Sequence, residues 1–182
     1  MAAVAEAASL TAVHPTAFVG AGAVLGEDVQ VGPFAIVEDG VRIGDGSRIL
    51  ASAHLITGTV IGRACEIHMG AIVGHTPQMR DLQGPGGGVR IGDGTIVREH
   101  VTVHRASRDG HATVIGDRCL LLANSHVAHD CHVGEEVTLA NGALLAGHVT
   151  VGDRAFISGN VCVHQFVRIG RLAMIGGLAR EQ

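Results

Sequence analysis

The sequence predicts an all-β solenoid built from hexapeptide repeats. Val, Ile or Leu occupies 25 of the 28 positions taken every sixth residue from Val13 to Ile175, and the exceptions are Met79, Pro85 and Asp109. Neither an amphipathic helix, with apolar residues about 3.6 apart, nor a half-buried strand, with a period of 2, gives this spacing. In most repeats glycine or another small residue follows the aliphatic residue. A short period held over most of a chain is typical of a solenoid.

Repeats of this kind resemble those of the left-handed parallel β-helix, in which three six-residue sides form one triangular coil of eighteen residues. The resemblance implies the handedness. One aliphatic side chain per side would fill a narrow prism, and a small residue at each corner would let the chain turn. The absence of Trp and Tyr fits such an interior. At eighteen residues per coil there is room for roughly nine coils after residue 13, and stacking at about 4.8 Å makes them a rod of about 40 Å. We expect one domain over residues 1–182, with a lead-in at residues 1–12.

The composition excludes several classes of protein. The net charge is -4 and there is no run of Lys or Arg and no stacking aromatics, so we expect no nucleic-acid partner. No apolar run approaches the length of a membrane span. The N-terminus has no early Lys or Arg and makes a poor signal peptide, which favours a cytoplasmic location. Cys65, Cys119, Cys131 and Cys162 form no C-x-x-C pair, so we expect reduced structural thiols.

Two polar segments depart from the repeat, at about 75–90 and 105–113. Neither can fill the prism, so we expect two excursion loops, and loops on a rigid scaffold tend to carry function. The glycine-rich end of the first segment lacks the Gly-Lys-Ser/Thr of a phosphate loop and is interpreted as a flexible linker. The flat outer faces and the unpaired end strands of such a rod predict a side-by-side homotrimer.

The histidines are the candidate functional residues, since 12 occur in 182 residues and they cluster late in the chain. The repeat is unbroken from Ile115 to Ile175, so residues eighteen apart should lie one above the other. The spacing predicts two adjacent columns near His126 and His164, formed by His129, Gly147 and Gln165 and by Asp130, His148 and Phe166.

An imidazole beside a carboxylate, with a glycine N–H one coil away, could transfer an acyl group directly to a hydroxyl or amine. A neutral imidazole can take the proton of the attacking group, and the carboxylate can fix its tautomer. The N–H can stabilise the oxyanion. The spacing leaves two alternatives open: satisfied polar residues at corners or at a trimer interface, and a metal site. His126-x-x-His129-x-x-His132 is dense, although no histidine trio cleanly matches the spacing of the zinc-dependent β-helical carbonic anhydrases.

The stretch Asn124-Ser-His-Val-Ala-His-Asp-Cys131, followed by Leu145-Ala-Gly-His-Val149 and Val163-His-Gln-Phe166, resembles the acyl-[acyl-carrier-protein]:UDP-N-acetylglucosamine O-acyltransferases of lipid A biosynthesis. The resemblance runs from about His14 to Gly177. It implies that a 3-hydroxyacyl group passes from acyl carrier protein to the 3-position of UDP-N-acetylglucosamine. It also implies a homotrimer with active sites between subunits, and no cofactor beyond the phosphopantetheine of the carrier.

The same resemblance assigns roles to individual residues. It implies His129 as general base, Asp130 as the carboxylate that orients it and Gly147 as the oxyanion-stabilising amide. Residues implied to bind substrate are Asp81, Gln83, His104, His126, His148, His164, Gln165 and, at the acyl tail, Gly177.

Two departures from the family pattern keep alternatives open. The family has Asp-Leu-Lys where this chain has Asp81-Leu-Gln83, and a neutral amide cannot neutralise a phosphate unless Arg80 substitutes for the lysine. The family also continues into a helical C-terminal segment, which we expect this chain to lack. An acetyl-CoA-dependent sugar acyltransferase, a zinc-dependent hydro-lyase of the carbonic anhydrase type and a catalytically inactive trimeric solenoid are therefore the alternative functions.

Overall fold

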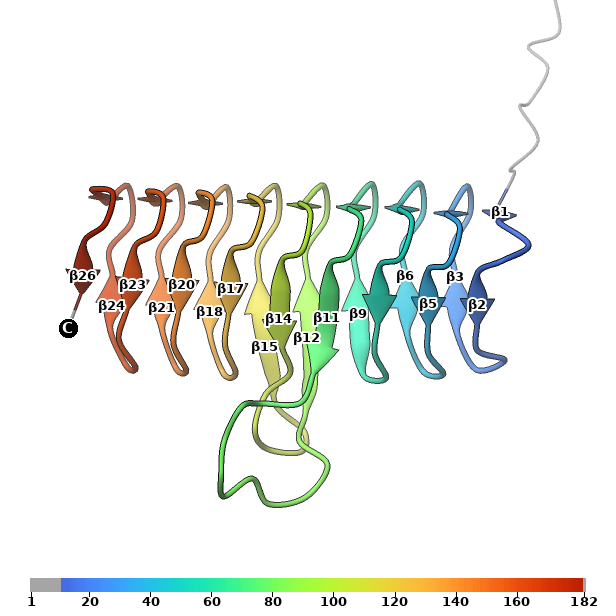
Figure 1. The fold of residues 1–182 in the computed structure, drawn as a ribbon, viewed down its shortest axis with the longest axis horizontal. Helices are drawn as coiled ribbons and strands as arrows, with labels where there is room; N and C mark the ends of the chain where they lie inside the picture. Colours follow the sequence, from blue (N-terminus) through green and yellow to red (C-terminus); the bar gives the residue numbers. More distant parts are fainter. Residues whose placement is uncertain (1–10, 182) are drawn as a thin grey trace, which may run out of the picture.

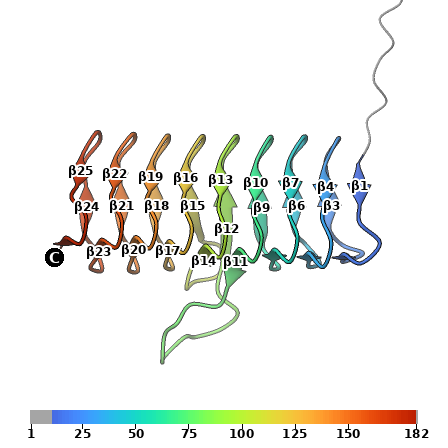
Figure 2. The ribbon, with the colours of Figure 1, turned by 45° about the horizontal axis from the view of Figure 1, so that its top comes forward.

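The computed structural model describes residues 11–181, in which 26 short parallel strands form three sheets around a triangular prism (Figures 1 and 2). Most of the predicted lead-in lies outside the described residues, and Ala12 already belongs to the first strand.

Sheet A contains β1 (Ala12–Val13), β4 (Gln30–Val31), β7 (Arg48–Ile49), β10 (Glu66–Ile67), β13 (Ile96–Val97), β16 (Leu120–Leu121), β19 (Thr138–Leu139), β22 (Phe156–Ile157) and β25 (Met174–Ile175). Sheet B contains β2 (Phe18–Val19), β5 (Ile36–Val37), β8 (His54–Leu55), β11 (Ile72–His75), β14 (Thr102–His104), β17 (His126–Val127), β20 (Leu144–Leu145), β23 (Cys162–Val163) and β26 (Arg180–Glu181). Sheet C contains β3 (Val24–Leu25), β6 (Arg42–Ile43), β9 (Thr59–Ile61), β12 (Gly88–Ile91), β15 (Ala112–Ile115), β18 (His132–Val133), β21 (Thr150–Val151) and β24 (Arg168–Ile169).

The pairing register confirms the predicted coil. In an uninterrupted stretch each residue pairs with the residue eighteen positions later, as Gln30 does with Arg48. The second residue of a strand points inward and the first points outward, because side chains alternate along a strand. Every third strand therefore returns to the same sheet one coil further on. The architecture is a left-handed parallel β-helix, and no helix in residues 11–181 is long and apolar enough to cross a membrane.

The core is the stack of inward aliphatic side chains. Leu121, Leu139 and Leu145 are fully buried, as the six-residue repeat requires. Fully burying each such side chain contributes about 1.5 to 3 kcal/mol. Small residues precede the strands and include Cys119 and Cys131, which are buried free thiols. Burial raises the pKa of Cys119 to about 11 and that of Cys131 to about 12, so both remain protonated and unreactive.

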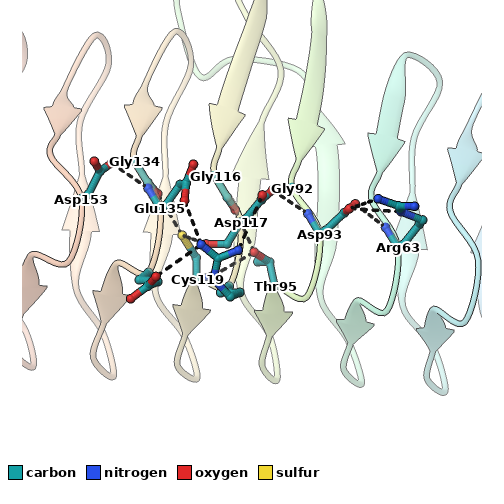
Figure 3. A network of polar contacts seen from close by, with 12 residues as sticks. Arg63, Gly92, Asp93, Thr95, Gly116, Asp117, Cys119, Gly134, Glu135 and Asp153 are labelled. Carbon is teal, nitrogen blue, oxygen red and sulfur yellow. Dashed lines mark hydrogen bonds and ion pairs between the residues drawn. The ribbon is translucent and has the colours of Figure 1, made fainter.

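The Gly-Asp phrases of the repeat form a ladder along the corner between sheets C and A (Figure 3). The backbone N–H of Arg63 donates to Asp93 Oδ1 at 2.8 Å, and that of Glu135 donates to Asp153 Oδ1 at 3.0 Å. This backbone bond is the main reason that the pKa of Asp93 lies below its ordinary value. A Cβ on Gly62 would lie 2.5 Å from Asp93 Oδ1, so glycine leaves room for the carboxylate of the following coil.

Both interruptions of the repeat leave the prism at the corner between sheets B and C, at the bottom of Figure 1. Residues 76–87 form the first loop and residues 105–111 form the second loop, so the flanking strands extend further than the sequence indicates. Ile91 pairs with Ile61, thirty residues earlier, and Ile115 pairs with Ile91, twenty-four residues earlier. The insertions therefore contain twelve and six residues, and the six-residue beat passes through both without a change of phase.

The prediction that the glycine-rich end of the first loop is a flexible linker is wrong. The N–H of Gly87 donates to Ala106 C=O at 2.8 Å, and the N–H of Gly88 donates to His111 C=O at 2.9 Å. A Cβ on Gly87 would collide with the carbonyl oxygens of His111 and Arg108. The glycines are needed because this backbone packs directly on the second loop, and Gly88 already begins β12.

Candidate active site

The candidate site lies at the corner between sheets B and C, one coil further along the rod than the second loop. β17 ends at Val127, and the chain turns through residues 128–131 before β18 begins. Asp130 adopts a left-handed conformation with φ of 59°, which Asp tolerates better than most residues. This turn directs the side chains of His129 and Asp130 toward each other.

His129 and Asp130 form a hydrogen-bonded dyad. The distance from His129 Nδ1 to Asp130 Oδ2 is 2.7 Å, and His129 is only 7% exposed. Burial alone would raise the pKa of Asp130, but hydrogen bonds from His129 and Ser107 hold it below its ordinary value. An ionised carboxylate at this distance favours the tautomer with the proton on Nδ1, which leaves the Nε2 lone pair to accept a proton.

Gly147 lies against the imidazole, one coil above it. A Cβ at this position would lie 2.5 Å from Cε1 and 2.6 Å from Nε2 of His129. The ring can occupy its place only because residue 147 has no side chain. The N–H of Gly147 donates no hydrogen bond within residues 11–181 and remains available as a donor.

His148 and Phe166 continue the neighbouring column. The ring centroids of His129 and His148 are 5.1 Å apart in an edge-to-face arrangement, and His148 stacks on Phe166 at 4.7 Å. His148 Nε2 is 3.8 Å from Asp130 Oδ2. The stack fixes His148 at the mouth of the site.

A second group of imidazoles lies on sheet B beside the dyad. His104 packs edge-to-face on His126 at 4.7 Å, and His126 Nδ1 is 2.7 Å from Thr102 Oγ1. Burial first, and then the neighbouring histidines His126 and His75, lower the pKa of His104 to about 4. Burial also lowers the pKa of His126. Near neutral pH His104 is therefore an uncharged donor or acceptor.

A cavity of about 420 Å³ opens next to the dyad. Its walls come from the second loop and from the B–C corner, and they comprise Ser107, Arg108, His111, Ala112, Asp130 and His148. One wall thus carries the dyad carboxylate, and the other carries an arginine without an ion-pair partner among the described residues. The lining is therefore polar and carries charges of both signs.

The comparisons with known proteins point to one family. The family model for the bacterial transferase hexapeptide (six repeats) matches residues 22–57 and 112–147. The acyl-[acyl-carrier-protein]–UDP-N-acetylglucosamine O-acyltransferase of Bartonella henselae is 44% identical over 170 residues, which are 93% of this chain and 62% of that protein. LpxA from Bacteroides fragilis, a UDP-N-acetylglucosamine acyltransferase, superposes with a TM-score of 0.91 at 36% identity, over 93% of this chain and 67% of that one.

The chain belongs to the UDP-N-acetylglucosamine acyltransferase family. LpxA from Acinetobacter baumannii agrees, with a TM-score of 0.91, 37% identity and coverage of 93% of this chain and 66% of that one. The chain spans less than two thirds of the length of the curated acyltransferases of Bartonella henselae and Agrobacterium fabrum, at 62% of each.

Several residues that the resemblance to these acyltransferases assigns to substrate lie further from the dyad. His164 and Gln165 are exposed on the next B–C corner, one coil above Gly147. Asp81 and Gln83 are exposed in the first loop, and no described residue forms a hydrogen bond or ion pair with either. Gly177 is exposed at the A–B corner of the last described coil, near Gly159. Within one chain, Gly177 is therefore not part of the dyad site, and the roles of these five residues remain predictions.

The geometry also bears on the metal alternative. The dense run His126-x-x-His129-x-x-His132 does not converge, because His126 is bonded to Thr102 on sheet B and His132 points outward from sheet C. Within residues 11–181, His129, Asp130 and His148 alone form a group that could hold an ion, with ligand atoms within 4.8 Å of one another. In this group Nδ1 of His129 already faces Asp130.

Sequence reasoning missed the residues that hold Asp130. The N–H of Ser107 lies 3.2 Å from both carboxylate oxygens, and the N–H of Asp130 donates to Thr113 Oγ1 at 2.9 Å. Both lie before the unbroken repeat that begins at Ile115, where counting in steps of eighteen does not apply. For Ser107 the sequence gives no indication of this role. For Thr113 the one indication is its hydroxyl, at an inward position that holds Ala or Val in most coils.

Proposed function

We propose that this chain transfers a 3-hydroxyacyl group from acyl carrier protein to the 3-hydroxyl of UDP-N-acetylglucosamine. The observation that carries the proposal is the dyad, in which Nδ1 of His129 faces Asp130 Oδ2 at 2.7 Å while the other side of the ring faces Gly147. The likeness to acyltransferases that act on these substrates supports the choice of donor and acceptor.

The mechanism follows from the free Nε2 atom. Nε2 of His129 removes the proton of the sugar hydroxyl as the oxygen attacks the thioester carbonyl, and Asp130 stabilises the imidazolium that forms. The N–H of Gly147 donates to the developing oxyanion. When the tetrahedral intermediate collapses, the C–S bond breaks, the ester forms and the imidazolium returns its proton to the thiolate. No residue of the chain becomes acylated.

The surroundings of the dyad suit the proposed substrates. Arg108 lines the cavity beside the dyad and could complement a nucleotide diphosphate, which would offset the neutral Gln83. His104, His126, His148, His164 and Gln165 would contact substrate, while Gly177 and Asp81 would do so from neighbouring subunits of a homotrimer. The reaction needs no cofactor other than the phosphopantetheine of the carrier, and we place it in the cytoplasm.

The test is a transfer assay with 3-hydroxyacyl carrier protein and UDP-N-acetylglucosamine. We expect His129→Ala to lower kcat by about 100- to 10,000-fold, the range typical of a general base. His132→Ala is the matched control, because this histidine is exposed on sheet C three residues away, and its rate should match the wild type. Equal rates in both variants would exclude His129 as the base. Transfer from acetyl-CoA in place of the carrier protein would favour the acetyl-CoA-dependent alternative.

A zinc-dependent hydro-lyase is the second candidate, because His129, Asp130 and His148 could hold an ion. Metal analysis of the purified protein separates the two functions. Full transferase activity after treatment with a chelator supports direct acyl transfer. If the protein instead holds one zinc per subunit and hydrates carbon dioxide in a reaction that a chelator abolishes, the hydro-lyase replaces the acyltransferase as its function.

A further inference from the structure

The corner that holds the dyad departs from the hydrogen-bonding rule of its neighbours. In the next two coils the left-handed corner residue donates its N–H to the carbonyl one coil back, as His148 does to His129 at 3.0 Å and Phe166 does to Gly147 at 3.2 Å. Asp130 has no such carbonyl, because the preceding coil opens at this corner into the second loop. Its N–H instead donates to Thr113 Oγ1 at 2.9 Å.

Thr113 places a hydroxyl inside the prism. It is fully buried at an inward position of β15, where the register aligns it with Val89 of β12. A hydroxyl in an apolar core is unfavourable unless it is hydrogen-bonded. Here it accepts from the N–H of Asp130, which would otherwise be left without an acceptor at this corner.

The second loop supplies the other half of the support. The N–H of Ser107 lies 3.2 Å from Oδ1 and 3.2 Å from Oδ2 of Asp130. The first loop and its flanking strand hold the second loop in turn. The backbone N–H of Gly87 donates to Ala106 C=O, and the backbone N–H of Arg105 donates to His75 C=O at 3.0 Å. Thr113, just after the second loop, thus holds the backbone of Asp130, and Ser107, within the loop, holds its carboxylate.

We propose that Thr113 and the N–H of Ser107 are positioning groups that hold the Asp130 carboxylate on Nδ1 of His129. Among the described residues, neither group forms a hydrogen bond with His129, and both act on Asp130. Without the Thr113 hydroxyl the left-handed turn loses the bond that fixes it, and the carboxylate no longer aims at Nδ1. The second loop therefore sets the tautomer of His129 as well as lining the cavity. The consequence for catalysis rests on the proposed function, whereas the consequence for the tautomer does not.

The primary experiment replaces Thr113 by Val, which keeps the shape and removes the acceptor. In the full chain, nitrogen-15 NMR should detect the hydrogen-bonded Nδ1–H of His129 in the wild type and lose that signal in Thr113→Val. We expect kcat to fall by about 100-fold with KM little changed, since misplacement of a catalytic group by about 1 Å has this effect. Thr113→Ser restores the hydroxyl and should recover both readouts.

Thr59→Val is the matched control. Thr59 is also fully buried in sheet C, its register partner is the same Val89, and its hydroxyl bonds to Val73 C=O rather than to the dyad. This variant should keep the Nδ1–H signal and the wild-type kcat. Retention of the signal and of kcat in Thr113→Val would overturn the proposal, and so would equal losses in both valine variants.

A second pair of variants tests the loop if Thr113→Val does not fold. Ser107→Pro removes the backbone N–H, whereas Ser107→Ala keeps it. We expect loss of the Nδ1–H signal in the proline variant alone, and the same signal in both would contradict the role of the loop. The NMR signal could be present in the wild type and lost in Thr113→Val while the wild type transfers no acyl group. In that case the positioning role stands and the proposed function fails.

Discussion

At the scale of single residues, the site depends on one missing side chain. Gly147 has an ordinary backbone conformation, so its requirement for glycine comes from the imidazole that occupies the space of its Cβ. The proposed oxyanion donor is the N–H of this same residue, so the proposed base and the proposed donor both depend on the absence of a side chain at position 147.

We expect Gly147→Ala to fold and to lose activity. The added methyl group would lie 2.5 Å from Cε1 of His129, so the ring must move away from the N–H. A shift of about 1 Å lowers kcat about 100-fold. Gly170→Ala is the control, because a Cβ there meets nothing within 4 Å. Equal kcat values for the two variants in the transfer assay would show that the ring does not need this space.

His104 links the site to the pH dependence of stability. Its folded-state pKa of about 4 lies below the ordinary value of 6.5, so the unfolded chain binds this proton first as the pH falls. The contribution of neutral His104 is complete above pH 6.5 and is lost progressively toward pH 4. The free energy of unfolding should drop by about 1 to 2 kcal/mol between pH 7 and pH 5 from this group.

His104→Gln removes the titrating group and keeps a polar side chain. Denaturant unfolding at pH 7 and pH 5 should show a smaller loss of stability in this variant than in the wild type. His14→Gln is the control, since His14 is exposed. An equal loss in His104→Gln and the wild type would mean that His104 is not held neutral by its surroundings.

At the scale of elements, the two loops form one layer on the B–C corner. The first loop returns to β12 through glycines that pack on the carbonyls of the second loop, and the second loop in turn holds Asp130. The glycines of the first loop thus hold the second loop, and Ser107 of the second loop holds Asp130 of the dyad. A disturbance in the first loop should therefore be detectable at the site.

Gly87→Ala tests this layer, because its Cβ would collide with the carbonyl oxygens of His111 and Arg108. We expect the two loops to separate, with faster amide hydrogen exchange at Ala106 and Gly88 and a lower kcat. Gly176→Ala, where a Cβ has nothing within 4 Å, should leave both unchanged. Unchanged exchange in Gly87→Ala would show that the loops do not depend on each other.

The loops also mark the limit of prediction from the sequence. The repeat fixes the coils and the column of His129 and Gly147, because side-chain direction follows the count of residues. The exceptions Met79, Pro85 and Asp109 show where the insertions lie. The count does not show how the displaced backbone is held, because insertions of twelve and six residues leave the beat in phase. Nor does it reveal that Thr113 replaces a carbonyl, since this depends on where the displaced backbone goes. The glycines were misinterpreted because flexibility and close packing require the same residue.

At the scale of the whole molecule, stability should be distributed unevenly along the rod. Each coil contacts only its neighbours, so a solenoid is stabilised by a sum of local interfaces. Inward side chains are fully buried through the central coils, whereas Val13 is 44% exposed and Ile175 is only partly buried. The dyad lies among the well-buried coils, where its geometry is held from both sides.

Two matched leucines test this gradient. Leu121 is fully buried in β16, and Leu25 in β3 is only partly buried near one end. Leu121→Ala should lower the free energy of unfolding by about 2 to 5 kcal/mol, because it leaves a cavity that the narrow prism cannot close. Leu25→Ala should lower it by clearly less, since less apolar surface is lost from the core. Equal losses in denaturant unfolding would contradict the gradient of core burial along the rod.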